Sequence, residues 1–302
     1  MYGRVMTILA AALLAAFALW AACCRRAPAP PAPTAGGPRV VALSPAVGII
    51  LQDLGREGLI VGRHGSDMTL SPSLPVCGDH LAIDIEALQR VHPTLVLTQW
   101  GTRDLPEAYV SLAKREGWAT HDCQLLTVDD IRREIGEIDA LLPAPHDKAK
   151  ALVAEFDRVL TPRPSRKGAG KVLLLSGIDP VGALGPGSWH HQMLVAMGGT
   201  PAIEQGAAWI DLASEDLVRL GPDAIIVLMP RSPRTPPRGK DEAAYVGEEA
   251  IARLPELART PTPAFKSKHI AVIDDPLSLT PSTAMIRVAR QMGEALDAWS
   301  GK

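Results

Sequence analysis

The sequence has little net charge and few aromatic residues. Its 302 residues include 31 Lys and Arg and 33 Asp and Glu, which gives a formal charge of −2. A protein held on nucleic acid or anionic lipid by its overall charge needs a stronger imbalance, so that class is excluded. Aromatic residues make up only 4% of the chain, so its core must consist mainly of Leu, Val, Ile and Ala. An aromatic side chain outside that core is therefore a candidate for function.

The sequence also lacks the common catalytic motifs. It contains no Gly-x-Ser-x-Gly, no Walker loop, no Cys-x-x-Cys and no His-Glu-x-x-His. Residues 182–187 are rich in glycine, but their spacing does not fit a dinucleotide-binding loop and predicts a turn. With 47% hydrophobic and 21% charged residues, the chain nevertheless has the composition of a folded protein, long enough for one large domain or two ordinary ones.

The N-terminus carries a segment for export or membrane attachment. An apolar run at residues 5–22 follows a single cation, as in a secretory signal. The run has about 18 residues, the lower limit for spanning a bilayer, so an uncleaved anchor stopped by the arginines at 25–26 remains an alternative. Residues 19–23 (LWAAC) resemble a bacterial lipobox, in which Cys23 would be lipidated and begin the mature chain. Otherwise Cys23 is an ordinary residue of the signal at 1–23.

Residues 24–38 consist largely of Ala and Pro, a composition that favours an extended, semi-rigid tether. A tether behind an export segment places the folded body in the periplasm or on the cell surface. In such a compartment Cys77 and Cys123 are candidates for a disulfide, although two cysteines do not establish one.

From residue 39 onward, short β-branched runs alternate with amphipathic stretches, and this pattern occurs twice. It predicts an α/β fold with largely parallel sheets. The expected strands are at 39–43, 59–62, 95–98, 171–175, 224–228 and 270–273. The expected helices are at 46–54, 84–91, 106–116, 191–197, 214–220 and 282–299.

Between the two halves, residues 147–160 have the spacing of one uninterrupted helix, with Leu152, Phe156 and Leu160 on its apolar face. An ordinary crossover helix inside one domain is one interpretation. A bridge between two lobes is the other interpretation. The position of the helix between two sets of βα units favours this second interpretation. The predicted division is an N-terminal lobe at 39–145, an inter-lobe helix at 146–163 and a C-terminal lobe at 164–302.

Several segments together carry a resemblance to a known family. Residues 76–80 (VCGDH), 84–88 (DIEAL) and 93–97 (PTLVL) resemble the N-terminal lobe of helical-backbone solute-binding proteins, which serve the ABC importers of cobalamin, haem and ferric siderophores. Residues 187–199, 209–217 and 222–226 resemble the C-terminal lobe, in the expected order, and the wording is closest to the cobalamin-binding type.

The resemblance implies an α/β fold of two Rossmann-like lobes joined by a single long inter-lobe helix, with the ligand cleft between them and little hinge closure. It implies no catalysis and no resident cofactor, since any cobalt or iron would belong to the ligand. The implied partners are a small metal chelate and the permease dimer of an ABC importer. Glu86 and Glu215 match the lobe-tip glutamates that meet permease arginines; otherwise they are acids favoured by a helix dipole.

Three tryptophans match positions where the family places cleft aromatics: Trp100, after a predicted strand, and Trp189 and Trp209, in loops before predicted helices. Core packing is the alternative for each. His80 stands where many relatives carry Tyr, and His190 follows Trp189, so an imidazole is expected to face the cleft from either lobe. No metal bond is assigned to either histidine; solvated or helix-capping roles remain open.

Two polar loops are further candidates for the cleft lining. Arg63 suits a carboxylate or phosphate group on the ligand, and Asp275 lies in a loop expected at the same opening. Residues 59–65 (LIVGRHG) also resemble the start of histidine phosphatases, in which His64 would be phosphorylated and Arg63 would hold phosphate. Residues 230–249 predict a long surface loop of unassigned role.

The sequence therefore predicts a membrane-attached, extracytoplasmic binding protein that captures a metal chelate, a corrinoid first, and delivers it to an ABC importer. A haem- or ferric-siderophore-binding protein of the same fold is the first alternative. The others are a surface receptor or adaptor without a transporter and, remotely, a phosphatase that uses Arg63 and His64.

Overall fold

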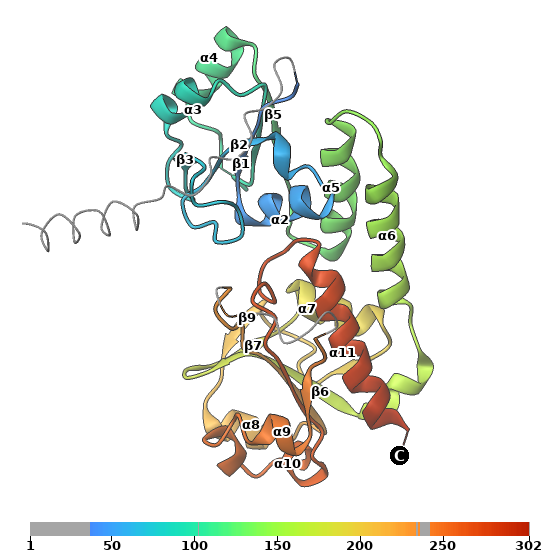
Figure 1. Ribbon diagram of the computed structural model, residues 1–302. Helices are drawn as coiled ribbons and strands as arrows, with labels where there is room; N and C mark the ends of the chain where they lie inside the picture. The colour runs from blue at the N-terminus through green and yellow to red at the C-terminus, as the bar shows by residue number, and fades with distance from the viewer. Residues whose placement is uncertain (1–36, 102, 234, 236–241, 302) are drawn as a thin grey trace, which may run out of the picture.

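The computed structural model describes residues 37–101, 103–233, 235 and 242–301. These residues form two α/β lobes, each built on its own sheet (Figure 1). The predicted fold class, two α/β lobes, is confirmed; the sheet of the first lobe is parallel, and that of the second is mixed. The export segment, Cys23 and nearly all of the Ala- and Pro-rich tether lie outside the described residues.

The first lobe contains a parallel sheet in the order β3-β2-β1-β4-β5. Its strands are β1 (Val40–Leu43), β2 (Ile60–His64), β3 (Val76–Gly78), β4 (Leu95–Thr98) and β5 (Ala119–Asp122). Its helices are α2 (Pro45–Asp53), α3 (Ile85–Val91), α4 (Glu107–Glu116) and α5 (Val128–Ala140). Alternate residues of β1 face opposite sides, and both sides are covered. Val40 and Ala42 pack with α2 and α5, whereas Val41 and Leu43 pack with α3 and α4.

The second lobe contains a mixed sheet in the order β11-β12-β10-β6-β7-β9, with β8 paired to β6. The three central strands are parallel, whereas β7 and β11 are antiparallel to their neighbours. Its strands are β6 (Lys171–Ile178), β7 (Val181–Leu184), β8 (Thr200–Pro201), β9 (Trp209–Asp211), β10 (Ala224–Leu228), β11 (Tyr245–Val246) and β12 (Ile270–Ile273). Its helices are α7 (Trp189–Ala196), α8 (Ser214–Leu220), α9 (Glu248–Ile251), α10 (Pro263–Ser267) and α11 (Ala284–Ser300).

Two local predictions in this lobe are wrong. The glycine-rich stretch expected as a turn contains strand β7, because Val181–Leu184 pairs with both β6 and β9. The segment at 230–249, expected as a surface loop, contains β11, which adds to the sheet beside β12, and the start of α9. Residues 234 and 236–241 of that segment lie outside the described residues.

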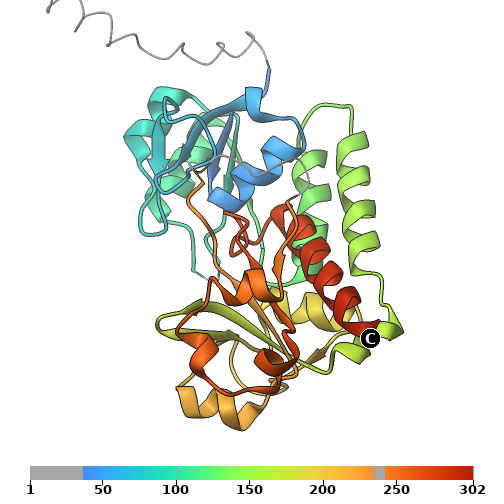
Figure 2. The same ribbon diagram turned by 60° about the horizontal axis from the view of Figure 1, so that its bottom comes forward.

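Helix α6 (Asp147–Leu160) lies at the residues predicted for the inter-lobe helix. It runs beside α5 of the first lobe and α11 of the second in both views (Figures 1 and 2). Phe156 is fully buried in the core, and the opposite face is charged. An ion pair joins Asp157 to Arg132 of α5, and Glu155 accepts a 2.7 Å bond from Arg290 of α11. Helix α6 thus ties the two lobes together.

The lobes are also joined directly. Thr283 donates a hydrogen bond to Asp53 at the end of α2, and the backbone N–H of Val128 donates to the Gln192 side chain of α7. One buried apolar cluster continues from α2 and α5 through α6 into α7 and α11. Such continuous packing opposes a hinge motion between the lobes.

The two described cysteines do not form the disulfide for which the sequence makes them candidates. Cys77 and Cys123 are both free and buried. Cys77 is in β3 and Cys123 follows β5, the opposite edges of the first sheet. Four strand spacings separate these edges, about 19 Å, whereas a disulfide requires Cα atoms within about 7 Å. Burial raises the pKa of Cys77 to about 11 and raises that of Cys123 further, so both thiols are protonated at neutral pH.

Among the described helices, none combines the length and the apolar character needed to cross a membrane.

Candidate ligand-binding site

The first lobe gathers candidate binding residues at one edge of its sheet. His64 ends β2, His80 follows β3 and Trp100 follows β4. Because parallel strands end at the same edge, these residues come together there. The rings of His64 and His80 are tilted against each other with centroids 4.3 Å apart. His64 is fully buried, whereas His80 is exposed, so only His80 offers its imidazole to a ligand.

His64 packs against His80 from inside the lobe. Its Nδ1 accepts a hydrogen bond from the backbone N–H of Ser66 at 3.0 Å, and its Nε2 has no hydrogen-bond partner within the described part of the chain. Burial lowers the pKa of His64, and the neighbouring His80 lowers it further. The buried imidazole of His64, which packs against the exposed His80, is therefore neutral.

Trp100 is held firmly by its neighbours. Its backbone N–H and the Thr98 hydroxyl both donate to one carboxylate oxygen of Asp122, at 2.7 and 2.6 Å. Its indole N–H donates to the carbonyl of Asp104 at 3.0 Å. Only 8% of Trp100 is exposed, so little of its ring is open to solvent. This site residue was expected in the cleft, and the structure places it near His80.

Arg103 connects the two loops and was not anticipated from the sequence. Its guanidinium lies 4.3 Å from the centroid of the Trp100 ring, and its Nη2 donates to the backbone carbonyl of His80 at 2.8 Å. The side chain is exposed. A cation–π contact and a hydrogen bond thus place a positive charge beside His80 and Trp100. Its short separation from Trp100 in sequence was the only available signal. We call His80, Trp100 and Arg103 the first-lobe group.

Arg63 has a different orientation from the one expected. It is half-buried, and its Nη1 donates to the backbone carbonyls of His64 and Asp67 at 3.1 and 3.3 Å. Asp67 in turn accepts from the backbone N–H groups of Thr69 and Leu70, both at 2.8 Å. Arg63 therefore holds its own loop together in this structure.

The second lobe contains a cavity of about 760 Å³ at the carboxyl ends of β6, β10 and β12. Its wall consists of Ser176, Gly177, Ile178, Asp179, Leu228, Met229, Pro230, Arg231, Tyr245, Ala252, Arg253, Val272 and Asp274. Arg231 donates to Glu242 at 2.7 Å and to the carbonyl of Asp274 at 3.1 Å. The guanidinium of Arg253 lies 3.4 Å from the centroid of the Tyr245 ring. The wall is thus mixed, with apolar strand residues and two arginines.

Two predicted contacts in this lobe are wrong. His190 is fully buried, and its Nε2 donates to the carbonyl of Ser278 at 2.6 Å, so it cannot reach a ligand. Asp275 is 3% exposed and accepts bonds from Arg287 at 2.9 and 3.4 Å. Both residues are buried and bonded to neighbours inside the lobe, which sequence position does not reveal.

The other two tryptophans are not in loops. Trp189 is the first residue of α7 and packs partly against the core. Trp209 begins the edge strand β9 and is 52% exposed. In the part of the chain that the structure describes, neither residue lines the 760 Å³ cavity. The structure therefore brings Trp100 and His80 together at one edge of the first sheet, and it places Trp189 and Trp209 in α7 and β9 of the second lobe.

A family model described as periplasmic binding protein matches residues 40–277. The chain belongs to the periplasmic binding protein family. The resemblance to the solute-binding proteins of cobalamin, haem and siderophore importers is confirmed. A search of curated proteins finds no match.

Solved structures of periplasmic binding proteins share the fold at low identity. The vitamin B12 binding protein BtuF of Vibrio cholerae has a TM-score of 0.63 and 16% identity, with 88% of this chain and 99% of that chain covered. The heme-binding protein RhuT from Roseiflexus sp. RS-1 has a TM-score of 0.58 and 19% identity, with coverage of 88% and 100%. An ABC-type Fe3+-hydroxamate transport protein from Saccharomonospora viridis has a TM-score of 0.53 and 19% identity, with coverage of 86% and 93%.

As a periplasmic binding protein, the chain binds a solute and is not an enzyme. The phosphatase alternative is therefore wrong. The structure supplies a physical reason, because the His64 side chain is fully buried and the guanidinium of Arg63 is bound within its own loop.

Glu86 and Glu215 are exposed first-turn acids of this periplasmic binding protein, in α3 and α8. Helix α3 follows β3, and α8 follows β9, which runs in the same direction as β6. Both glutamates thus lie where the chain leaves the carboxyl edge of its sheet. In the first lobe this edge carries the first-lobe group, and in the second lobe it carries the 760 Å³ cavity.

Proposed function

We propose that this periplasmic binding protein captures a bulky metal chelate, a corrinoid first, between the carboxyl edges of its two sheets and delivers it to an ABC importer. The observation that carries the proposal is the first-lobe group. It puts an exposed imidazole, a mostly buried tryptophan and a guanidinium together at the edge where α/β lobes bind ligands. The name of the V. cholerae BtuF structure, a vitamin B12 binding protein of the same fold, supports the corrinoid class.

Haem is the second candidate, and specific observations favour it. His80 is exposed and carries an imidazole, the commonest axial ligand of haem iron. Arg103 beside it, and Arg231 and Arg253 in the second-lobe cavity, suit the carboxylates of a haem or a siderophore. The RhuT structure is that of a heme-binding protein.

The test is a titration of the purified protein with cobalamin, cobinamide, haemin and a ferric siderophore, followed by tryptophan fluorescence. One chelate is expected to quench the emission saturably. Arg103→Ala removes an exposed side chain and should weaken that binding without unfolding the protein. Trp118→Phe is the control, since Trp118 packs in the cluster with α3 and α4 and immediately precedes β5, at the amino edge of the first sheet. Lack of quenching by all four chelates would overturn the proposal.

His80 distinguishes the two candidates. With haemin, His80→Ala should alter the Soret spectrum if the imidazole binds iron. With a corrinoid, the same variant should weaken binding only modestly. His92→Asn is the control, because His92 is exposed and its backbone contacts Arg39 at the amino edge of the sheet. Asn also tolerates the left-handed backbone found there, with φ 43°.

We propose further that Glu86 and Glu215 dock on the permease dimer. Two exposed acids, one in each lobe, suit recognition by a two-fold partner. Glu86→Lys or Glu215→Lys should abolish chelate uptake by cells while leaving chelate binding unchanged. Glu107→Lys, a first-turn exposed acid of α4, is the control and should transport normally. Normal uptake by both charge-reversal variants would instead favour a receptor or adaptor without a transporter.

We propose that lipid on Cys23 holds the protein at the membrane through the Ala- and Pro-rich tether. The lipobox-like residues 19–23 support this. Cys23→Ala should release the protein from membranes, and metabolic labelling with a fatty acid should be lost. Retention of Cys23→Ala in the membrane fraction would favour an uncleaved anchor.

A further inference from the structure

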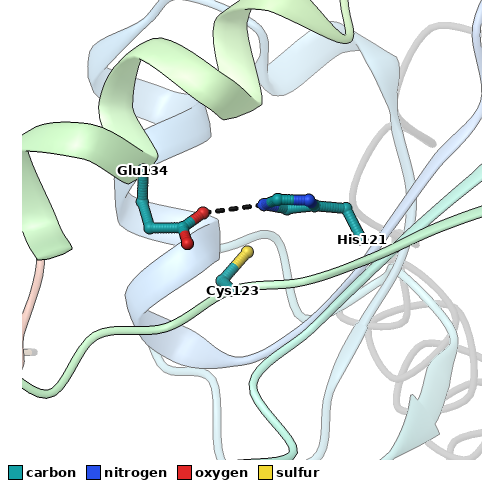
Figure 3. A group of neighbouring side chains, drawn as sticks. All are labelled: His121, Cys123 and Glu134. Carbon is teal, nitrogen blue, oxygen red and sulfur yellow. Dashed lines mark hydrogen bonds and ion pairs between the residues drawn. The ribbon is translucent and has the colours of Figure 1, made fainter.

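His121, Cys123 and Glu134 form a cluster of metal-ligating side chains that the chelate site does not use. His121 is in β5, Cys123 follows it, and Glu134 is in the adjacent helix α5. One ligand atom from each residue lies within 4.8 Å of the others. Figure 3 shows all three side chains directed into the same space between strand and helix.

The chain places four donor groups on this space from two elements. Residues 121 and 123 are two positions apart in extended backbone, so their side chains lie on the same face. Glu134 and Glu137 are three residues apart on α5 and so share a helix face. Nε2 of His121 lies 2.8 Å from Glu134 and 3.8 Å from Glu137. The donor set is therefore one imidazole, one thiol and two carboxylates.

Burial removes the Glu134 carboxylate and the Cys123 thiol of this cluster from water. The Glu134 side chain is 2% exposed, and Cys123 is fully buried. One Glu134 oxygen accepts the backbone N–H of Gln124 at 2.9 Å, while Arg133 stays 3.9 Å away. His121 is thus the one basic side chain recorded within hydrogen-bond distance of Glu134 in the described part of the chain. A buried carboxylate gains from a cation at close range.

We propose that His121, Cys123 and Glu134 bind a divalent transition-metal ion of the Zn²⁺ type, with Glu137 or water as the fourth ligand. Mixed nitrogen, sulfur and oxygen donors are the set that Zn²⁺ accepts, and harder cations such as Mg²⁺ avoid thiolates. This inference goes beyond the capture of a chelate and does not depend on it.

The geometry needs only local adjustment. Tetrahedral Zn²⁺ bonds of about 2.0–2.3 Å put ligand atoms about 3.3–3.8 Å apart. The ion would replace the 2.8 Å hydrogen bond between His121 and Glu134 and displace the Cys123 thiol proton. The bond from Gln124 already orients the Glu134 carboxylate. His121 is 25% and Glu137 46% exposed at the side chain, so the ion has an entry path from solvent.

The test uses the untagged, reduced protein with Co²⁺ alone as a spectroscopic probe and Zn²⁺ as competitor. The bound Co²⁺ is expected to show a thiolate-to-metal charge-transfer band and visible bands of tetrahedral coordination, and equimolar Zn²⁺ should abolish both. Cys123→Ser should remove the charge-transfer band. Cys77→Ser is the matched control, because Cys77 is also buried and free but lies at the opposite edge of the sheet.

A second variant covers the case in which Cys123→Ser fails to fold. His121→Asn changes a partly exposed side chain and should weaken Co²⁺ binding by more than about tenfold, as loss of a supporting group at metal sites already does. The wild-type protein should also melt at a higher temperature with Zn²⁺, since the ion binds only the folded chain. Absence of a charge-transfer band in the wild type, or metal binding that survives both variants, would overturn the proposal.

Discussion

His190 shows how burial alone changes a residue's chemistry. Its Nε2 donates to the Ser278 carbonyl, whereas its Nδ1 has no hydrogen-bond partner among the described residues. Burial lowers its pKa to about 4, so the folded protein holds a neutral ring. The unfolded chain would bind a proton at its ordinary pKa of about 6.5.

This difference predicts a loss of stability in mild acid. Between pH 6.5 and pH 4 the unfolded state binds more protons, so the free energy of unfolding falls as the pH falls. Above pH 6.5 the ring is neutral in both states and no stability is lost. The free energy of unfolding has fallen by about 3 kcal/mol near pH 4. Urea unfolding at several pH values measures it. His190→Gln should flatten this part of the profile and the exposed control His92→Asn should not; an unchanged slope in His190→Gln would contradict the assignment.

Asp122 should position Trp100 rather than contact the ligand. In Asp122→Ala, the Trp100 N–H and the Thr98 hydroxyl lose their acceptor, at a cost of about 1–3 kcal/mol. The fluorescence emission should shift to longer wavelength as Trp100 gains contact with water. Asp122→Asn keeps one acceptor oxygen and should show a smaller effect. Equal stability and emission in wild type and Asp122→Ala would show that these bonds do not hold Trp100.

The sequence identified part of the first-lobe group. Trp100 was predicted because it follows a strand, where ligand residues gather, and His80 because it stands where many relatives carry Tyr. Arg103 and the tilted ring contact between His64 and His80 were missed, since they depend on how two loops fold against each other. His190 and Asp275 were misassigned because a polar residue in a loop or first helical turn looks the same in sequence whether it is exposed or paired inside.

Among the elements, the 3₁₀ segment η2 (Pro164–Ala169) is fastened to α11 by a buried arginine. Arg166 is 4% exposed and donates to both oxygens of Asp297 at 2.7 and 3.0 Å. These bonds hold the pKa of Asp297 below its usual value. The contribution of this ion pair to the free energy of unfolding is therefore complete above the ordinary aspartate pKa. It is lost as the pH falls through the lowered pKa of Asp297.

Asp297→Asn should destabilise the protein by about 3 kcal/mol, because it leaves the buried Arg166 charge without its partner. Arg163 contacts the same carboxylate at 2.7 Å but is 57% exposed. Arg163→Gln is therefore the control and should cost less than about 1 kcal/mol. Chemical denaturation at pH 7 compares the two; similar losses for both variants would contradict the importance given to the buried bond.

Elements with a strong apolar pattern were predictable, and weakly patterned ones were not. The helix Asp147–Leu160 and the strands Leu95–Thr98, Ala224–Leu228 and Ile270–Ile273 lie where predicted. Helix α5 was missed because its charged residues mask an apolar stripe at Ile131, Ile135 and Ile138. The edge strands β5 and β9 were missed because they are short and partly exposed, with few apolar residues to reveal them.

At the scale of the whole molecule, the two lobes behave as one packed body. Helix α6 contacts α5 and α11, and the direct bonds from Thr283 to Asp53 and from Val128 to Gln192 add to this contact. Ligand capture is therefore expected without a large closing motion. Small-angle X-ray scattering of the free and chelate-bound protein should give the same radius of gyration within error. A clear contraction on binding would indicate hinge closure instead.

The measurement that tests the account most directly is a crystal structure of the protein with the chelate that quenches its fluorescence. The account predicts the chelate between the two sheets' carboxyl edges, against His80, Trp100 and Arg103 on one side and the 760 Å³ cavity on the other. A chelate bound elsewhere, such as the groove between α5 and α6 lined by Ala149 and Val153, would contradict it.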